Sequence, residues 1–173
     1  RRSRPKTRQG TNDQADSQRM SDDETVSGPA TPPLANPTLR MGADGDAVID
    51  PFWAQVGGRP TFERLVHRFY QGVRLDPVLA PMYPQDDWEG AEARLTGFLE
   101  QYWGGPTTYS QERGHPRLRQ RHQPFHINPD ARDRWLAHMR VAVDELDLAP
   151  MHESALWDYL ERAAGAMVNT FAD

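Results

Sequence analysis

The stretch FLEQYWGGPTTYSQERGHPRLRQRHQPF, residues 98–125, decides the fold of this chain. It begins within an apolar helical stripe that ends at the sequence WGGP, residues 103–106. A polar segment follows, and we predict that residues 107–115 form a loop. Pro116 then opens a short arginine-rich turn that presents His122. This order places one imidazole opposite an apolar helix face, with guanidinium groups beside it.

A flat, apolar, metal-bearing ligand with acidic edges needs this combination of groups. The imidazole would bind the metal, and the apolar helix face would contact the flat ring. Guanidinium groups would bind the acidic edges, because their paired N–H donors match a carboxylate. Haem is the ligand that meets this description.

The composition of the 173 residues changes near residue 48. Residues 1–48 are rich in Ser, Thr, Pro, Gly, Asp and Asn and have hardly any aromatic or β-branched side chains. Such a segment buries too little apolar surface to offset its ordering entropy, so we predict a disordered N-terminal extension. Residues 49–173 are of a size typical of one domain with a single core.

Several kinds of site are excluded by residue types that the chain lacks. There is no cysteine, which rules out disulfides, thiolate metal sites and cysteine nucleophiles, and which fits the cytoplasmic location that we expect. Lys6 is the only lysine, so the folded part has neither a phosphate-binding GxxxxGK[ST] loop nor a Schiff-base lysine. The chain has no run of about 18 consecutive apolar residues, so the sequence predicts no membrane-spanning helix. The acidic excess of the folded part argues against nucleic-acid binding.

Helical periodicity runs through the folded part. The expected helices cover residues 52–56, 60–75, 87–103, 129–146 and 150–168. In the second of these, apolar side chains recur at steps of three and four: Phe62, Leu65, Val66, Phe69, Tyr70 and Val73. Proline-rich residues 77–84 form a corner after it. We find no alternating strand pattern, so the predicted fold class is all-α.

Four strings in this part resemble those of a known family: FERLVHRFY (62–70), PMYPQDD (81–87), RDRWLAHM (132–139) and the long run from EGAEAR to RQRH (89–122). They are similar to strings of the truncated haemoglobins, in particular of the group II (O-type) branch. The resemblance covers about residues 52–168. It implies a truncated globin fold, a two-over-two helical sandwich around haem b (iron protoporphyrin IX), with a very short first helix.

The resemblance also implies roles for individual side chains. His122 corresponds to the proximal iron ligand. Tyr70, Tyr83 and Trp135 correspond to the polar groups that line the distal pocket. Ala91 faces the ligand from the third helix, where it is too small and inert to donate a hydrogen bond. Hydrogen bonds to the ligand would therefore come from the tyrosines and the tryptophan.

Other side chains are expected to contact haem. Leu118, one helical turn before the histidine, can pack on the ring plane. Arg121 is the favoured partner of a propionate, and Tyr109 and Arg94 are weaker candidates for the same role. Leu95, like Ala91, is expected to face the ligand from the third helix, and the expected cavity wall consists of Phe62, Phe69, Phe98, Leu99 and Met139.

The residues alone leave alternatives for the iron ligand. A histidine on a short helix is most often a surface residue. His122 could therefore be a surface histidine instead of the iron ligand. His115 is the one serious rival, followed at a distance by His126. We expect His115 to lie at the haem edge instead.

The donors of the distal pocket suggest what the protein does. Each of them would slow the escape of bound dioxygen about tenfold, which argues against simple oxygen transport. The leading hypothesis is binding of dioxygen and of other diatomic gases such as NO and CO, with conversion of NO to nitrate or peroxidase-like activity supported by an external electron donor. A haem-based gas or redox sensor without turnover and a haem-free helical adaptor are the alternatives. A homodimer is the assembly that the resemblance suggests.

Overall fold

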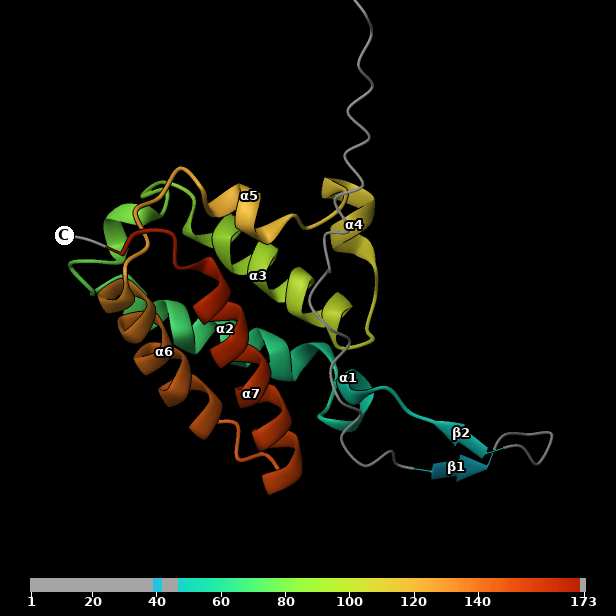
Figure 1. Ribbon diagram of the computed structural model, residues 1–173. Coiled ribbons are helices and arrows are strands. Elements are labelled where there is room, and N and C mark those ends of the chain that lie inside the picture. The colour runs from blue at the N-terminus through green and yellow to red at the C-terminus, as the bar shows by residue number, and fades with distance from the viewer. Residues whose placement is uncertain (1–38, 42–46, 172–173) are drawn as a thin grey trace, which may run out of the picture.

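The computed structural model describes residues 39–41 and 47–171 of the chain (Figure 1). Its helices are α1 (Phe52–Gln55), α2 (Arg59–Val73), the 3-10 helix η1 (Ala80–Met82), α3 (Trp88–Tyr102), α4 (Thr108–Arg113), α5 (Leu118–His122), α6 (Pro129–Asp144) and α7 (Pro150–Met167). Among the described residues, no helix is long and apolar enough to cross a membrane.

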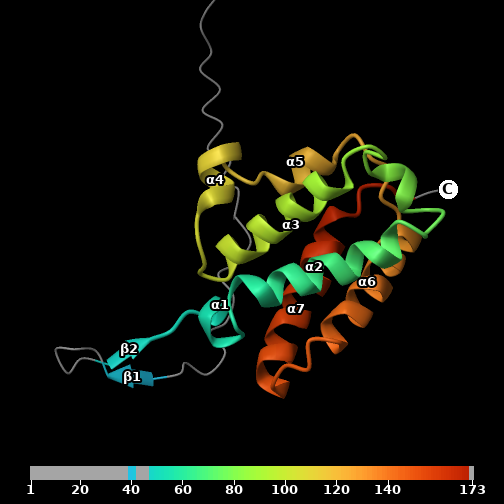
Figure 2. The same ribbon diagram turned by 180° about the vertical axis from the view of Figure 1, so that it is seen from behind.

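The four long helices form two pairs. Seen from behind in Figure 2, α2 and α3 lie in front of α6 and α7. Helix α2 contacts both α3 and α6, and α6 contacts α7. This arrangement confirms the predicted two-over-two helical sandwich. The very short first helix is also confirmed, because α1 ends at two glycines with positive φ, Gly57 (104°) and Gly58 (68°), a conformation that other residues rarely adopt.

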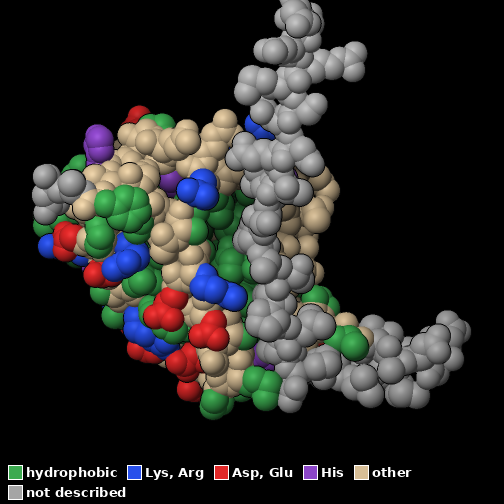
Figure 3. Space-filling view, in the orientation of Figure 1, with side chains coloured by type: hydrophobic (Ala, Val, Ile, Leu, Met, Phe, Trp, Pro, Cys, Tyr) green, Lys and Arg blue, Asp and Glu red, His purple; other side chains and the backbone are tan. Residues whose placement is uncertain are grey.

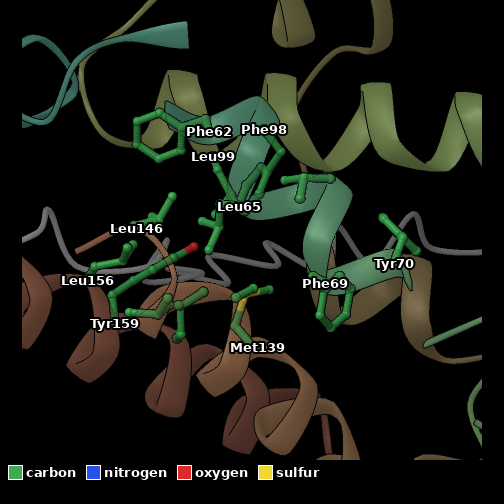
Figure 4. Packing of buried hydrophobic residues seen from close by; sticks show 14 of the residues in the cluster. Phe62, Leu65, Phe69, Tyr70, Phe98, Leu99, Met139, Leu146, Leu156 and Tyr159 are labelled. Atoms are coloured by element: carbon green, nitrogen blue, oxygen red, sulfur yellow. The ribbon is translucent and has the colours of Figure 1, made fainter. Parts of the chain in front are cut away.

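The core lies where the two pairs meet. The apolar stripe of α2 is buried as the periodicity predicts, and Leu65 and Phe69 are fully inaccessible. Figure 4 shows Met139 of α6 pointing toward this stripe, and Leu156 and Tyr159 approach from α7. Burying one such side chain stabilises the fold by about 1.5–3 kcal/mol. Packing against two partner helices therefore holds α2 in place.

The prediction of a loop at residues 107–115 is wrong, because residues 108–113 form α4. Its stability comes from contacts with α3. The Tyr109 ring is buried and packs edge-on against Phe98, with centroids 5.8 Å apart. The backbone N–H of Ser110 donates to Gln101 Oε1 at 2.9 Å, and Gln101 Nε2 donates to Ser110 Oγ at 2.6 Å. A helix of one and a half turns is too short to show a periodic pattern in the sequence.

A short strand pair precedes the helices, which the sequence analysis did not anticipate. Strand β1 (Leu39–Met41) pairs antiparallel with β2 (Ala47–Ile49), with Leu39 opposite Ile49. The pair projects away from the helical body in both views (Figures 1 and 2). A lone two-stranded pair contributes little stability, and the helical domain remains all-α as predicted. The rest of the segment predicted to be disordered, residues 1–38 and 42–46, lies outside the described residues.

One buried carboxylate holds the corner between α2 and α3. Asp76 Oδ1 accepts the backbone N–H groups of Val78 (2.9 Å) and Leu79 (3.1 Å). Its Oδ2 accepts a hydrogen bond from His138 Nε2 at 2.9 Å and lies 3.6 Å from Arg134 Nη1. Burial by itself raises the pKa of Asp76, but these hydrogen bonds and the guanidinium outweigh it and lower the pKa to about 2. The ionised carboxylate therefore ties the corner to α6.

We predict that Asp76→Asn lowers the free energy of unfolding by about 2 kcal/mol at pH 7, because removing the charge removes the interaction behind the lowered pKa. A lowered carboxyl pKa stabilises the protein above the unfolded-state value, and this contribution is lost as the pH falls toward 2. The difference between wild type and variant should therefore shrink below pH 4 in denaturant titrations at several pH values. Asp86→Asn, an exposed change in the same corner, should unfold like the wild type. A pH-independent difference for Asp76→Asn would contradict this account.

Candidate functional site

One cavity of about 560 Å³ is lined by residues from every helix between α2 and α7. The predicted site residues that line it are Tyr70, Tyr83, Ala91, Arg94, Leu95, Phe98, Tyr109, Leu118, Arg121, His122 and Trp135. A hollow lined by apolar side chains, with Lys or Arg side chains beside it, is visible on the face shown in Figure 3. The sequence analysis thus selected residues that are far apart in the chain and that the fold brings to one cavity.

Some of the predicted site residues do not line the cavity. His115 is exposed, and its Nδ1 accepts the backbone N–H of Arg117 at 3.3 Å. Met139 is fully buried in the core between the helix pairs (Figure 4). Phe62, Phe69 and Leu99 are core residues in the same way. From sequence, a core position and a cavity wall look alike, because both require an apolar side chain at helical spacing.

The sequence analysis missed several lining residues. They are Leu79, Met82, Pro84, Arg113, Phe125, Ile127, Ala131, Arg132, Ala164 and Met167. Ala164 continues the buried series Leu156 and Leu160 at steps of four along α7, and that spacing was a usable signal. Phe125 and Ile127 belong to an irregular segment after α5, where no periodic pattern exists.

His122 is held by its own helix. The Nδ1–H of the imidazole donates to the Leu118 carbonyl, one turn earlier, at 2.7 Å. This hydrogen bond selects the tautomer of the neutral imidazole in which Nδ1 carries the hydrogen and Nε2 carries the lone pair. The side chain is half-buried and borders the cavity. A neutral imidazole oriented in this way is a ready metal ligand, and the carbonyl behind it raises its basicity.

The segment that follows His122 is fixed by Asn169, which comes directly after α7. Asn169 Nδ2 donates to the carbonyl oxygens of His122 (3.2 Å) and Phe125 (2.9 Å). Its Oδ1 accepts the backbone N–H of Ile127 at 3.0 Å, and its backbone N–H donates to the Ile127 carbonyl at 2.9 Å. One amide side chain therefore connects the end of α7 to both sides of the turn that follows the histidine.

Polar aromatic side chains form a second group in the cavity lining. The rings of Tyr70 and Tyr83 meet edge-on, with centroids 5.5 Å apart. Burial raises the pKa of Tyr83 to about 12, and a hydrogen bond between its side chain and that of Trp135 partly opposes the rise. Burial likewise raises the pKa of the Tyr70 phenol far above its usual range. Both phenols are therefore neutral at physiological pH and keep their O–H groups as donors.

Arginines surround part of the cavity. Arg94 Nη1 donates to Asp87 Oδ2 at 2.8 Å. Arg121 donates from Nε to the Pro116 carbonyl at 2.8 Å and from Nη2 to the Arg113 carbonyl at 3.1 Å. These contacts hold the Arg121 guanidinium without a carboxylate partner among the described residues. It is free to bind an anionic group of a ligand in the cavity.

A family model described as bacterial-like globin matches residues 51–169. The chain belongs to this globin family. The match includes every helix and all the residues that line the cavity.

Comparison with single globins identifies the branch. The chain is 41% identical over 112 residues to a group 2 truncated haemoglobin of Bacillus subtilis, covering 65% of this chain and 84% of that protein. Among solved structures, it is 60% identical to a thermostable haemoglobin from Thermobifida fusca, with a TM-score of 0.68 and coverage of 69% and 98%. The group II truncated haemoglobin of Bacillus anthracis is 36% identical, with a TM-score of 0.69 and coverage of 73% and 96%. The resemblance to group II truncated haemoglobins is thereby confirmed.

We predict that Asn169→Ala lowers the free energy of unfolding of this globin by about 1–2 kcal/mol, because the side-chain hydrogen bonds to His122, Phe125, Ile127 and Thr170 are lost at an exposed site. The amide of Ile127 should also exchange with solvent faster. Denaturant titration and hydrogen exchange measure the two effects. Thr170→Ala is the control: it removes a hydroxyl that donates to Asn169 Oδ1 at 3.1 Å, and it should leave the Ile127 amide protected by the remaining Asn169 contacts. Wild-type exchange at Ile127 in Asn169→Ala would show that the side chain does not hold this segment.

Proposed function

We propose that this globin binds haem b in the cavity, with His122 as the iron ligand, and holds dioxygen or another diatomic molecule on the opposite side. One observation carries the proposal. His122 borders the cavity, and its Nδ1–H donates to the Leu118 carbonyl, so Nε2 carries the lone pair in the neutral imidazole and can bind a metal.

The remaining groups of the cavity suit haem. Leu95, Phe98 and Leu118 supply apolar surface of the kind that a porphyrin ring contacts. Arg121 has no carboxylate partner among the described residues and would hold a propionate through paired N–H donors. Arg94 is a second candidate for that role. The size of the cavity lies within the range of sites for cofactors and other small ligands.

The polar aromatic side chains act on the diatomic molecule. Haem iron held by His122 would supply a site for the diatomic molecule and redox chemistry. Tyr70, Tyr83 and Trp135 would donate hydrogen bonds to a ligand that carries partial negative charge. Ala91 contributes no donor and leaves room for the ligand. The raised pKa values of Tyr70 and Tyr83 keep both phenols protonated, so these two donors persist across physiological pH.

A pocket with several donors retains its ligand and releases it slowly. We therefore propose that the protein performs oxygen-dependent chemistry, such as conversion of NO to nitrate or peroxidase-like reduction, in preference to oxygen transport. Such turnover requires electrons from a separate donor. The cytoplasmic location, the homodimer and the role as a gas sensor stay predictions.

We predict that His122→Ala abolishes specific haem uptake, because no other side chain in the cavity offers an imidazole. Hemin titration followed by the Soret absorption measures this, with circular dichroism to show that the variant remains helical. His115→Ala is the matched control, since His115 is exposed outside the cavity, and it should bind hemin like the wild type. A normal Soret spectrum in His122→Ala would refute the ligand assignment.

We predict that Trp135→Phe accelerates dioxygen release about tenfold, because one hydrogen bond worth about 1–1.5 kcal/mol is lost while an aromatic ring remains at this position. Stopped-flow measurement of dioxygen displacement by CO gives the rate. Trp157→Phe is the control, because Trp157 lies under Arg140, outside the cavity lining. Unchanged release in Trp135→Phe would remove this side chain from the mechanism.

A further inference from the structure

The segment around α5 carries a concentration of positive charge. Residues 113–129 contain four arginines and no carboxylate: Arg113, Arg117, Arg119 and Arg121. None of the four has an ion-pair partner in the part of the chain that the structure describes. Most other arginines of the helical domain do: Arg59, Arg68, Arg74, Arg94, Arg132, Arg134 and Arg140. These four guanidinium groups are therefore available to bind an anionic ligand or partner.

The four arginines divide into two pairs by position. Arg113 and Arg121 line the cavity and are joined by the hydrogen bond from Arg121 Nη2 to the Arg113 carbonyl. Arg117 and Arg119 are exposed and do not line the cavity. We call Arg117 and Arg119 the outer arginine pair. Since haem has two propionates, the arginines that line the cavity are sufficient to hold it, and the outer arginine pair remains without an anion.

The outer arginine pair lies on the same short element as the proposed iron ligand. Arg117 is the residue before α5, and Arg119 is within it, one helical turn from His122 at its end. Arg117 has φ 43° and ψ 49°, a left-handed conformation that is unusual for a residue other than glycine. The helix is held to the cavity by the contact between His122 and Leu118. An anionic protein bound to the outer arginine pair would therefore stand beside the cofactor.

We propose that the outer arginine pair docks an electron-donor protein that presents clustered carboxylates. The proposal rests on the proposed function, in which haem occupies the cavity and takes electrons from a separate donor. One electron would leave the reduced donor and convert ferric to ferrous iron, with no bond formed or broken. Opposite charges at the rim of an interface act mainly by raising the association rate, which falls with ionic strength.

A protein donor fits this surface better than a polyanion does. The chain has a formal net charge of −5, and carboxylates are spread over α2, α3, α6 and α7. An extended nucleic acid or a flat anionic membrane would meet these carboxylates as well as the arginines, which is unfavourable. A compact protein with a local acidic cluster contacts the arginines alone.

The test uses the full haem-loaded chain and a reduced plant-type [2Fe–2S] ferredoxin as the acidic donor. Arg117→Gln/Arg119→Gln should reduce the second-order rate of haem reduction about tenfold at low salt, and the difference should vanish at high salt. Arg64→Gln/Arg68→Gln removes the same charge from α2 and should stay near the wild-type rate. Reduction by dithionite, a small reductant, should be equal in all three proteins.

Binding supplies a second readout that does not depend on turnover. Chemical-shift titration with oxidised ferredoxin should show perturbed amides around residues 117–119 in the wild type and not in Arg117→Gln/Arg119→Gln. An equal fall in the rate of haem reduction in both double variants would overturn the proposal, and so would the absence of ferredoxin binding. Binding only to phosphatidylserine vesicles or to an oligonucleotide would also overturn it. Failure of hemin uptake would instead refute the proposed function, and the titration of the haem-free protein would still decide whether the arginines dock the donor.

Discussion

The hydrogen bond from His122 Nδ1–H to the Leu118 carbonyl is the interaction on which the candidate site depends. It joins two residues of a helix that has only five, so orienting the imidazole needs no other element. The same bond selects the tautomer of the neutral imidazole that carries its hydrogen on Nδ1 and its lone pair on Nε2. The rest of the domain places this helix: Asn169 holds the segment after it, and His122 borders the cavity.

The two sides of the cavity are built by different means. At the histidine, the imidazole is oriented locally by the Leu118 carbonyl of its own helix, and the segment after it is held by the distant Asn169. At the polar aromatic side chains, the contacts among them join residues remote in sequence. Tyr70 comes from α2, Tyr83 from the corner after η1, and Trp135 from α6. Asp76 holds that corner by accepting backbone N–H groups while it pairs with His138 of α6. Changes in core packing would therefore disturb the donors before they disturb the imidazole.

Charge is distributed unevenly over the domain. Most arginines form ion pairs on the outer surfaces of the helices, where each pair contributes little to stability. The arginines of residues 113–121 lack such partners among the described residues, and two of them border the cavity. These unpaired arginines are the basis for the proposed binding of the acidic edge of a cofactor and of an acidic protein.

The sequence by itself determined the helical core, the short first helix and most of the cavity-lining residues, because apolar periodicity, paired glycines and long family-like strings are local features. Tertiary structure alone decided that residues 108–113 are helical, since Tyr109 and Gln101 act through contacts with another helix. It also decided that Met139 belongs to the core while Ala164 lines the cavity. Both positions have apolar side chains on helices, and only the packing of the helix pairs determines which of them meets open space.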